Sequence, residues 1–125
     1  MYNVIVADDE KNIREGIVEL IEWEKLGCKV CASMQNGAQV LKYLEEEKIH
    51  VDIIITDIKM PIMDGMELIG MLNERFPDIK VIILTAYSDF TYAQQAIKFQ
   101  VSDFVVKNDF FLELPRACLK NKNCT

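Results

Sequence analysis

Asp57 is the residue of this chain with the clearest capacity for chemistry. A nearly continuous apolar run, Val-Asp-Ile-Ile-Ile-Thr, leads directly into it, after which Pro61 breaks the chain and Asp64-Gly65 turns it. Such a run is typical of a buried strand, and we expect its last side chain to be a carboxylate left exposed at the carboxyl edge of the sheet. A carboxylate in that place can act as a nucleophile or as a metal ligand.

Polar residues also follow three other apolar runs. Asp8 and Asp9, with Glu10, come after the first run, Thr85 ends the fourth, and Lys107 follows the fifth. Taken singly, each could be a helix cap, a strand residue or a solvated side chain. In a parallel sheet, however, all of them reach one edge, where converging carboxylates repel one another unless a cation joins them. Oxygen ligands of this kind suit Mg²⁺.

Together these groups favour a site for phosphoryl transfer. An aspartate can accept a phosphoryl group as an acyl phosphate, and the protein then mainly positions and neutralises the transferred group. In this hypothesis Asp57 is the acceptor, and Mg²⁺ bridges carboxylate and phosphoryl oxygens. Lys107 pairs with a further phosphoryl oxygen, and the Thr85 hydroxyl binds the third.

The elements that must position these residues alternate along the chain. Strand-like runs occupy residues 3–7, 29–33, 51–56, 80–85 and 102–106. Apolar residues at helical spacing fall between them, around residues 13–21, 38–44, 68–72, 90–97 and 114–120, and Pro115 must then lie in the first turn of the last helix. This alternation predicts a single domain, residues 1–125, with an open α/β sheet and right-handed crossovers.

Composition narrows the class of function. The 125 residues include 14 basic and 20 acidic ones, a net charge of −6, which argues against direct nucleic-acid binding by this domain. No apolar run approaches the length of a membrane span, so we expect a soluble, cytoplasmic domain. Cys28 and Cys31 should point to opposite faces of a strand and be inert, and His50 alone offers no zinc or catalytic constellation.

The motifs as a set resemble the receiver domains of two-component response regulators, from about Tyr2 to about Leu114. They are Val-Ala-Asp8-Asp9-Glu, Asp57-Ile-Lys-Met-Pro-Ile-Met-Asp-Gly, Leu-Thr85-Ala-Tyr and Phe104-Val-Val-Lys107. The resemblance implies a flavodoxin-like, doubly wound, five-stranded parallel sheet of order 2-1-3-4-5 with five helices.

The resemblance also implies roles for individual residues. Asp57 is the phosphoacceptor, charged by a partner sensor histidine kinase. Asp9 and Asp57 look like direct Mg²⁺ ligands, Asp8 acts through water, and the backbone carbonyl of Lys59 completes the protein's share. Thr85 and Phe104 match the family's hydroxyl–aromatic switch pair. The domain itself is then no turnover enzyme, beyond self-catalysed transfer and slow hydrolysis of its acyl phosphate.

Other implied features concern regulation. Lys59 and Tyr87 flank the phosphorylation site and are candidates for tuning hydrolysis. The surface of the fourth helix, fifth strand and fifth helix is the family's usual signalling face and a candidate homodimer interface. The segments Trp23-Glu-Lys-Leu-Gly27 and Tyr87-Ser-Asp-Phe-Thr-Tyr-Ala are similar to receivers attached to AraC-type DNA-binding regions. That similarity predicts transcription regulation, with DNA contacted only by an output domain beyond Thr125.

Two departures from the family leave alternatives open. Lys107 is followed by Asn108 in place of the usual proline, and Gln100-Val101 stands where Gly-Ala is common. They motivate a phosphorylation-independent interaction module, and a stand-alone regulator without output domain is a related possibility. A phosphatase of the haloacid-dehalogenase type also uses an aspartate after a strand, but it needs a second acid at the position of Lys59.

Overall fold

Five parallel strands form one sheet in the computed structural model, which describes residues 1–47, 49–86, 94, 101 and 103–122. The strand order is β2-β1-β3-β4-β5, the predicted flavodoxin-like order. The strands are β1 (Tyr2–Ala7), β2 (Cys28–Met34), β3 (Ile53–Asp57), β4 (Lys80–Thr85) and β5 (Asp103–Val106). The third strand therefore starts two residues later than the apolar run suggested, and Asp57 is its last residue.

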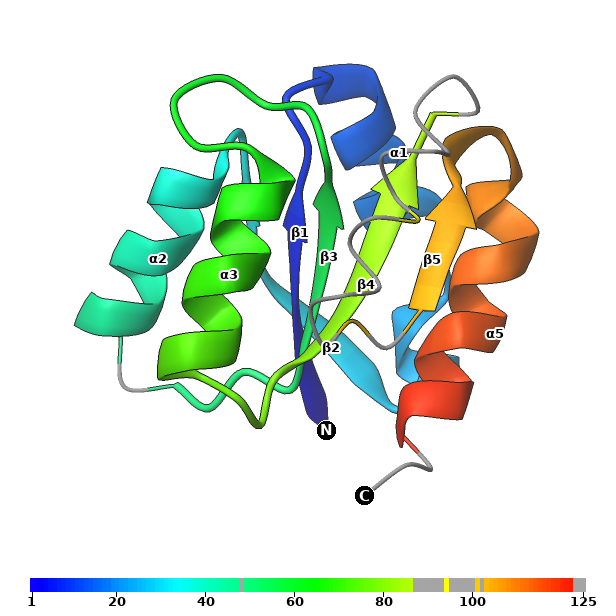
Figure 1. The fold of residues 1–125 in the computed structure, drawn as a ribbon. Coiled ribbons are helices and arrows are strands. Elements are labelled where there is room, and N and C mark those ends of the chain that lie inside the picture. The colour runs from blue at the N-terminus through cyan, green and yellow to red at the C-terminus, as the bar shows by residue number, and fades with distance from the viewer. Residues whose placement is uncertain (48, 87–93, 95–100, 102, 123–125) are drawn as a thin grey trace.

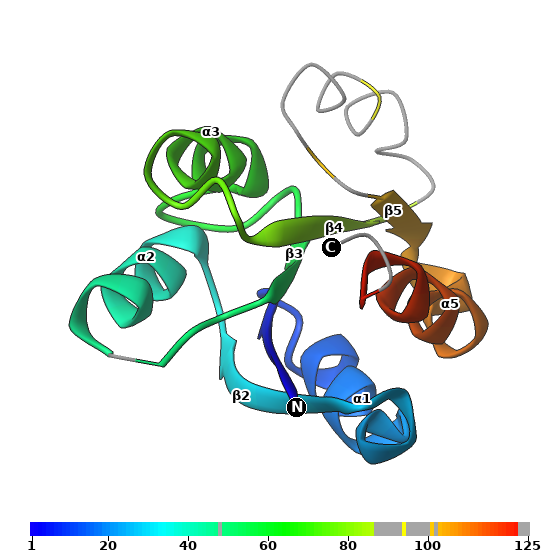
Figure 2. The same cartoon turned by 90° about the horizontal axis from the view of Figure 1, so that it is seen from below.

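Helices cover both faces of the sheet (Figures 1 and 2). Among the described residues they are α1 (Lys11–Leu20), α2 (Gly37–Glu46), α3 (Gly65–Arg75) and α5 (Phe110–Lys122), with 3₁₀ turns η1 (Trp23–Leu26) and η4 (Lys107–Asp109). Helices α1 and α5 pack on one face, and α2 and α3 pack on the other. Of the helix predicted around residues 90–97, all residues except residue 94 lie outside the described residues. None of the described helices is long and apolar enough to span a membrane.

The sheet separates two apolar clusters, as its doubly covered strands predict. All five residues of β3 are buried, and alternate side chains enter opposite clusters. Cys28 lies in the cluster beneath α1 and α5, whereas Cys31 packs against the other cluster. Because the two clusters lie on opposite sides of the sheet, the prediction that this pair points to opposite faces is confirmed.

The prediction for Pro115 is wrong. Helix α5 begins at Phe110, so Pro115 lies inside the helix and not in its first turn. A proline there cannot donate a backbone hydrogen bond one turn back. The neighbouring Leu114, Ala117 and Cys118 are nevertheless buried against the sheet, which explains how packing offsets that loss.

Gly65 holds the start of α3 against the end of β3. Its backbone N–H donates to the carbonyl of Ile58 at 2.7 Å. A Cβ at this position would lie 2.2 Å from the backbone oxygen of Asp57 and 2.9 Å from the Cα of Ile58. Because backbone atoms cannot move aside cheaply, only glycine fits here, and the loop carrying residues 58–64 is fixed relative to Asp57.

A Gly65→Ala protein is therefore expected to lose about 3 kcal/mol or more of its free energy of unfolding, since overpacking against backbone is costly. Urea unfolding followed by circular dichroism measures this loss. Gly16→Ala is the matched control, because its Cβ would meet only ordinary contacts at 3.6 Å and beyond on α1, and alanine favours a helix. Equal stabilities of the two variants would contradict the packing argument.

Candidate functional site

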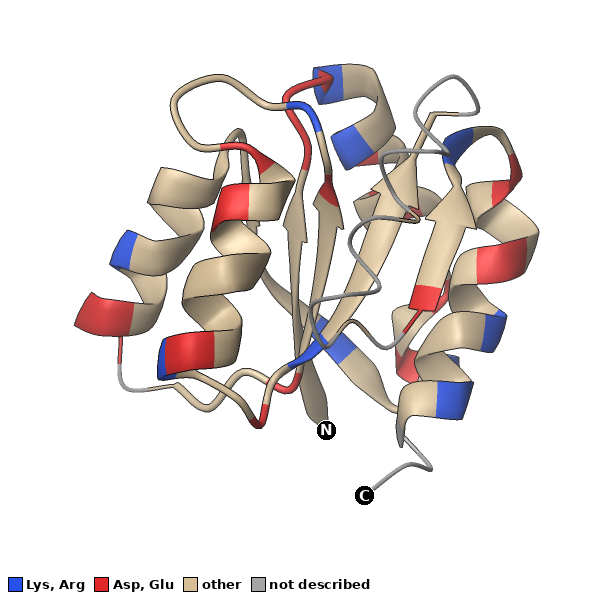
Figure 3. Cartoon of the chain, viewed as in Figure 1, with Lys and Arg blue, Asp and Glu red and all other residues tan. Residues whose placement is uncertain are grey.

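Three aspartates gather at the carboxyl edge of the sheet, as the sequence predicted. Asp8 and Asp9 follow β1, Asp57 ends β3, and these two strands are direct neighbours in the sheet. One carboxylate oxygen from each lies within 4.8 Å of the others, a spacing that could hold a metal ion. Acidic residues cluster visibly at this end of β1 and β3 (Figure 3). Asp8 and Asp57 are buried, whereas Asp9 is exposed.

Lys107 is brought to the same place by η4, directly after β5. Its Nζ lies 2.8 Å from Asp57 Oδ2 and 2.8 Å from Glu10 Oε1. Asp8 is close as well, with Oδ2 at 3.1 Å and Oδ1 at 3.3 Å. The side chain of Lys107 is only 8% exposed, so this ammonium group is a buried counter-ion and not a solvated lysine.

Asp57 itself is buried, which corrects the expectation of an exposed carboxylate. The residue is 4% exposed, because Lys107 covers its Oδ2. Its Oδ1 accepts a hydrogen bond from the backbone N–H of Ile58 at 2.7 Å. The backbone thus holds Oδ1 in place. Oδ2, which faces Lys107, is the oxygen that can exchange its hydrogen-bond partner.

Burial dominates the electrostatics of the carboxylates. The pKa of Asp8 is raised from its ordinary 3.8 to about 6, mainly by desolvation and also by the nearby charge of Asp57, against the opposing effects of the Glu10 backbone N–H and of Lys107. Burial also raises the pKa of Asp57, although Lys107 opposes that rise. Burial lowers the pKa of Lys107, but its carboxylate partners outweigh that effect and raise it overall. Carboxylate repulsion, expected from the sequence, is thus secondary to desolvation.

The residues present fit a divalent cation. Asp8 Oδ2 is fully buried and accepts no hydrogen bond, although the Lys107 ammonium lies 3.1 Å away. A buried carboxylate oxygen that accepts no hydrogen bond is one that a bound cation could coordinate. With Asp9 and Asp57 it forms an oxygen-only set, which suits a hard cation such as Mg²⁺.

Thr85 and Phe104 lie on the neighbouring strands β4 and β5. Residue 83 of β4 pairs with Phe104 and residue 85 pairs with Val106, so the side chains of Thr85 and Phe104 share one face of the sheet. The Thr85 hydroxyl is buried and donates to the carbonyl of Ala86 at 3.0 Å. Phe104 is half-buried against the cluster beneath α2 and α3. Their proposed roles stay predictions.

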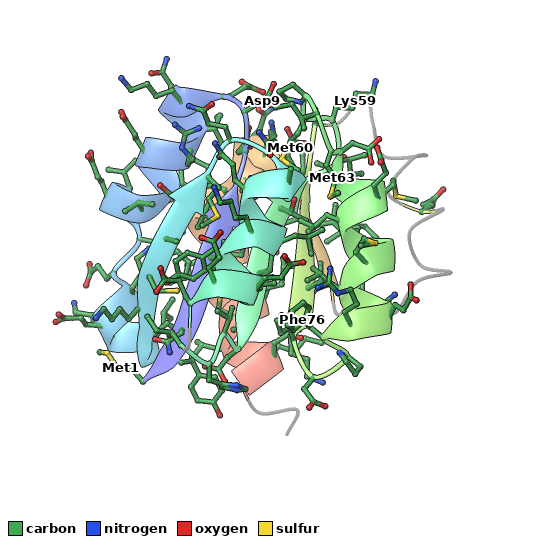
Figure 4. All side chains as sticks on the ribbon, turned by 90° about the vertical axis from the view of Figure 1, so that its left-hand side faces the viewer. Met1, Asp9, Lys59, Met60, Met63 and Phe76 are labelled. Carbon is green, nitrogen blue, oxygen red and sulfur yellow. The ribbon has the colours of Figure 1, made fainter. Side chains whose placement is uncertain are left out.

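Some of the remaining predicted residues are described by the structure, and others are not. Lys59 is exposed and lies at the same end of the molecule as Asp9 (Figure 4). The peptide bond between Lys107 and Asn108 is trans, and Lys107 nevertheless reaches Asp57. Tyr87 and Gln100 fall outside the described residues.

Two further residues contact the site: Glu10, which the sequence placed at this edge without a role of its own, and Arg14, which it did not single out. Glu10 pairs with Lys107, and Arg14 donates from its guanidinium to the backbone carbonyl of Asp8 at 2.7 Å. An acid just before a helix is ordinarily interpreted as a cap, and an arginine in the first helical turns as a surface residue. What separates these two residues from an ordinary cap and an ordinary surface residue is the turn after β1, which directs both side chains toward the end of the strand.

Known proteins resemble this chain in sequence and in structure. Residues 4–115 match the family model of the response regulator receiver domain. The uncharacterized transcriptional regulatory protein YesN of Bacillus subtilis is 38% identical over 107 residues, 86% of this chain but 28% of that protein. The transcriptional regulatory protein HptR of Staphylococcus aureus is 32% identical, over 86% of this chain and 41% of that protein.

A solved structure shows the same likeness in three dimensions. The REC domain of AraT, a response regulator from Geobacillus stearothermophilus, superposes with a TM-score of 0.86 at 35% identity, covering 98% of this chain and 96% of that one. The match to YesN and HptR, in contrast, spans less than half of either protein.

Proposed function

This chain belongs to the response regulator receiver family, and we propose that it is a switch in which Asp57 accepts a phosphoryl group in a Mg²⁺-dependent reaction. The single observation that supports this best is the contact of Lys107 Nζ with Asp57 Oδ2, 2.8 Å apart beside a buried and unsatisfied Asp8 oxygen. This contact supports the proposal because Asp57, the Lys107 ammonium and an unsatisfied carboxylate oxygen lie in one buried cluster.

The transfer would use Asp57 Oδ2 as the nucleophile. Its electron pair forms the new bond to phosphorus, and the bond from phosphorus to the donor nitrogen of a phosphohistidine breaks, its pair remaining on that nitrogen. Oδ1 stays on the backbone N–H of Ile58, which holds the carboxylate plane in place. Lys107 would pass from Oδ2 to an oxygen of the arriving group, so its charge stays with the acceptor throughout.

Asp8, Asp9 and Asp57, with the Lys59 carbonyl, are the proposed holders of the cation. A bound Mg²⁺ would neutralise charge on the carboxylates and on the phosphoryl oxygens. The Thr85 hydroxyl is engaged with Ala86 and would have to turn from it to reach a phosphoryl oxygen. That rotation would open space on the face shared with Phe104, which is the proposed start of the switch.

The partners belong to the same proposal. A sensor histidine kinase would supply the phosphoryl group. Phosphorylation would then change homodimer formation through the surface of the fourth helix, β5 and α5. The relatives named as transcriptional regulators suggest that the output is transcription, with DNA bound by an AraC-type region outside this chain. The domain is proposed not to turn over external phosphate esters, since the exposed Lys59 stands where a haloacid-dehalogenase enzyme needs an acid.

Phosphorylation by acetyl phosphate tests the proposal. The wild type with Mg²⁺ is expected to gain one phosphoryl group, measured by intact mass. Asp57→Asn should gain none, because an amide is no nucleophile for this transfer, and chelation of Mg²⁺ should suppress the wild-type reaction. Equal labelling of wild type and Asp57→Asn would contradict the proposed acceptor.

A further inference from the structure

Glu10 is an exposed carboxylate among the buried partners of Lys107. Its Oε1 accepts a hydrogen bond from Lys107 Nζ at 2.8 Å, as short as the bond to Asp57. The Glu10 side chain is 61% exposed, whereas the side chains of Lys107, Asp57 and Asp8 are 8%, 5% and 0% exposed. One partner of the buried ammonium therefore stands in water while the others do not.

The backbone around Glu10 explains why its side chain reaches the site. Its N–H donates to Asp8 Oδ1 at 2.9 Å, which folds the chain back immediately after β1. Glu10 directly precedes α1, yet its side chain makes no capping hydrogen bond with that helix. The carboxylate is thus directed to Lys107, in β5's connection to α5, and not to its own helix.

All three N–H donors of the Lys107 ammonium group face carboxylates. The group carries three N–H donors, and in the described part of the chain three carboxylates face it, those of Asp8, Glu10 and Asp57. Donating to a phosphoryl group on Asp57 requires that one of these contacts be released. Asp8 is fully buried and held by the Glu10 N–H, so an unpaired Asp8 would be costly. Glu10 can exchange Lys107 for water at little cost.

We propose that Glu10 restrains the Lys107 ammonium before transfer, in competition with the phosphoryl group, and releases the ammonium when that group arrives. The inference rests on the proposed function. Glu10 neither gives nor accepts a proton: the Asp57 Oδ2 electron pair forms the bond to phosphorus, and the donor leaves with the pair of the broken bond. Because the contact with Glu10 exists before the transition state and is lost in it, the contact slows transfer.

Two effects of opposite sign follow for Glu10→Gln. With acetyl phosphate and saturating Mg²⁺, the rate of phosphorylation is expected to rise about two- to fivefold, the range of a partly exposed ion pair. The Mg²⁺ affinity of the same variant, measured by calorimetry, is expected to fall by about the same factor because a nearby negative charge is lost. A merely structural role would move both quantities in one direction.

Two further variants separate contact from charge. Glu10→Asp keeps the charge but shortens the side chain by one methylene, so it should retain Mg²⁺ affinity and still phosphorylate faster. Glu19→Gln makes the same charge change at an exposed position of α1 and should alter neither quantity. In Mg²⁺-free wild type, the Lys107 ammonium should give a protected ¹H–¹⁵N signal, and Glu10→Gln should accelerate its hydrogen exchange.

The outcomes are distinguishable from those of the proposed function. An unphosphorylated wild type would overturn the acceptor role of Asp57 and this inference with it. A normally phosphorylated wild type, with Glu10→Gln equal to Glu19→Gln or slower, would overturn the role of Glu10 alone. Unchanged exchange of the Lys107 ammonium in Glu10→Gln would do the same.

Discussion

A Lys107→Met protein is expected to lose about 3 kcal/mol of its free energy of unfolding at pH 8 without divalent cations, the cost of removing one partner from a buried ion pair. Methionine matches the length of the lysine stem but leaves the buried Asp8 and Asp57 facing each other without a counter-ion. Both carboxyl groups already have raised pKa values with Lys107 present. Removing the ammonium must raise them further.

The loss should depend on pH and on Mg²⁺. Acids whose pKa is raised by folding bind protons more tightly in the folded state, so stability falls as pH rises from the unfolded pKa to the folded one. The deficit should therefore be small near pH 4 and complete at pH 8. Mg²⁺ should bind this variant about tenfold more tightly, equivalent to about 1.4 kcal/mol, because no ammonium competes for the carboxylates.

Urea unfolding with and without Mg²⁺ checks both statements. Lys11→Met is the matched control, since Lys11 is exposed and pairs only with Glu15 at 3.8 Å across one helical turn. That variant should stay within about 0.5 kcal/mol of wild type. If the two lysine variants were equally stable at pH 8, Lys107 would not be the counter-ion of the cluster.

The second large effect is expected for Asp8→Asn, in the opposite direction. The pKa of Asp8 rises from its ordinary 3.8 to about 6 on folding, so its ionised form costs stability above pH 6. Asparagine removes that charge and keeps an oxygen for the N–H of Glu10. The Mg²⁺-free variant should be about 2 kcal/mol more stable than wild type at pH 8, by the equivalence of one pKa unit to about 1.4 kcal/mol.

The gain should vanish toward pH 4, where Asp8 is protonated in the folded wild type and increasingly so in the unfolded chain. Asp8→Asn should also bind Mg²⁺ more weakly than wild type, because the buried Oδ2 is replaced by an amide nitrogen. Thermal unfolding across pH, with chelator, measures the first effect. Asp78→Asn, at an exposed position, is the control; a gain of the same size there would show that general charge, not burial, is responsible.

Much of the arrangement follows from the sequence, because parallel strands place their carboxyl ends at one edge. Asp8, Asp9 and Asp57 needed only that rule to be brought together, and the strand order β2-β1-β3-β4-β5 is as predicted. The helices α1, α2 and α3 were predictable because the side of each helix that faces the sheet is apolar, and this leaves apolar residues at helical spacing along the sequence.

What the sequence did not predict depends on contacts across the fold. Asp57 is buried because Lys107, fifty positions away, lies on it, and no local pattern reports that. The Lys107–Glu10 pair likewise joins residues 97 positions apart. Pro115 was misplaced for a related reason: helix propensity places a proline at a first turn, and the packing of Leu114 and Cys118 overrides that preference.

Chemical trapping of the acyl phosphate tests the central claim most directly. Wild-type protein is phosphorylated with acetyl phosphate and Mg²⁺, reduced with borohydride, digested and sequenced by mass spectrometry. Reduction of a phosphoaspartate yields homoserine, and we predict homoserine at position 57 in wild type and at no position in Asp57→Asn. An unmodified Asp57, or homoserine at Asp8 or Asp9 instead, would contradict the assignment of Asp57 as the phosphoacceptor.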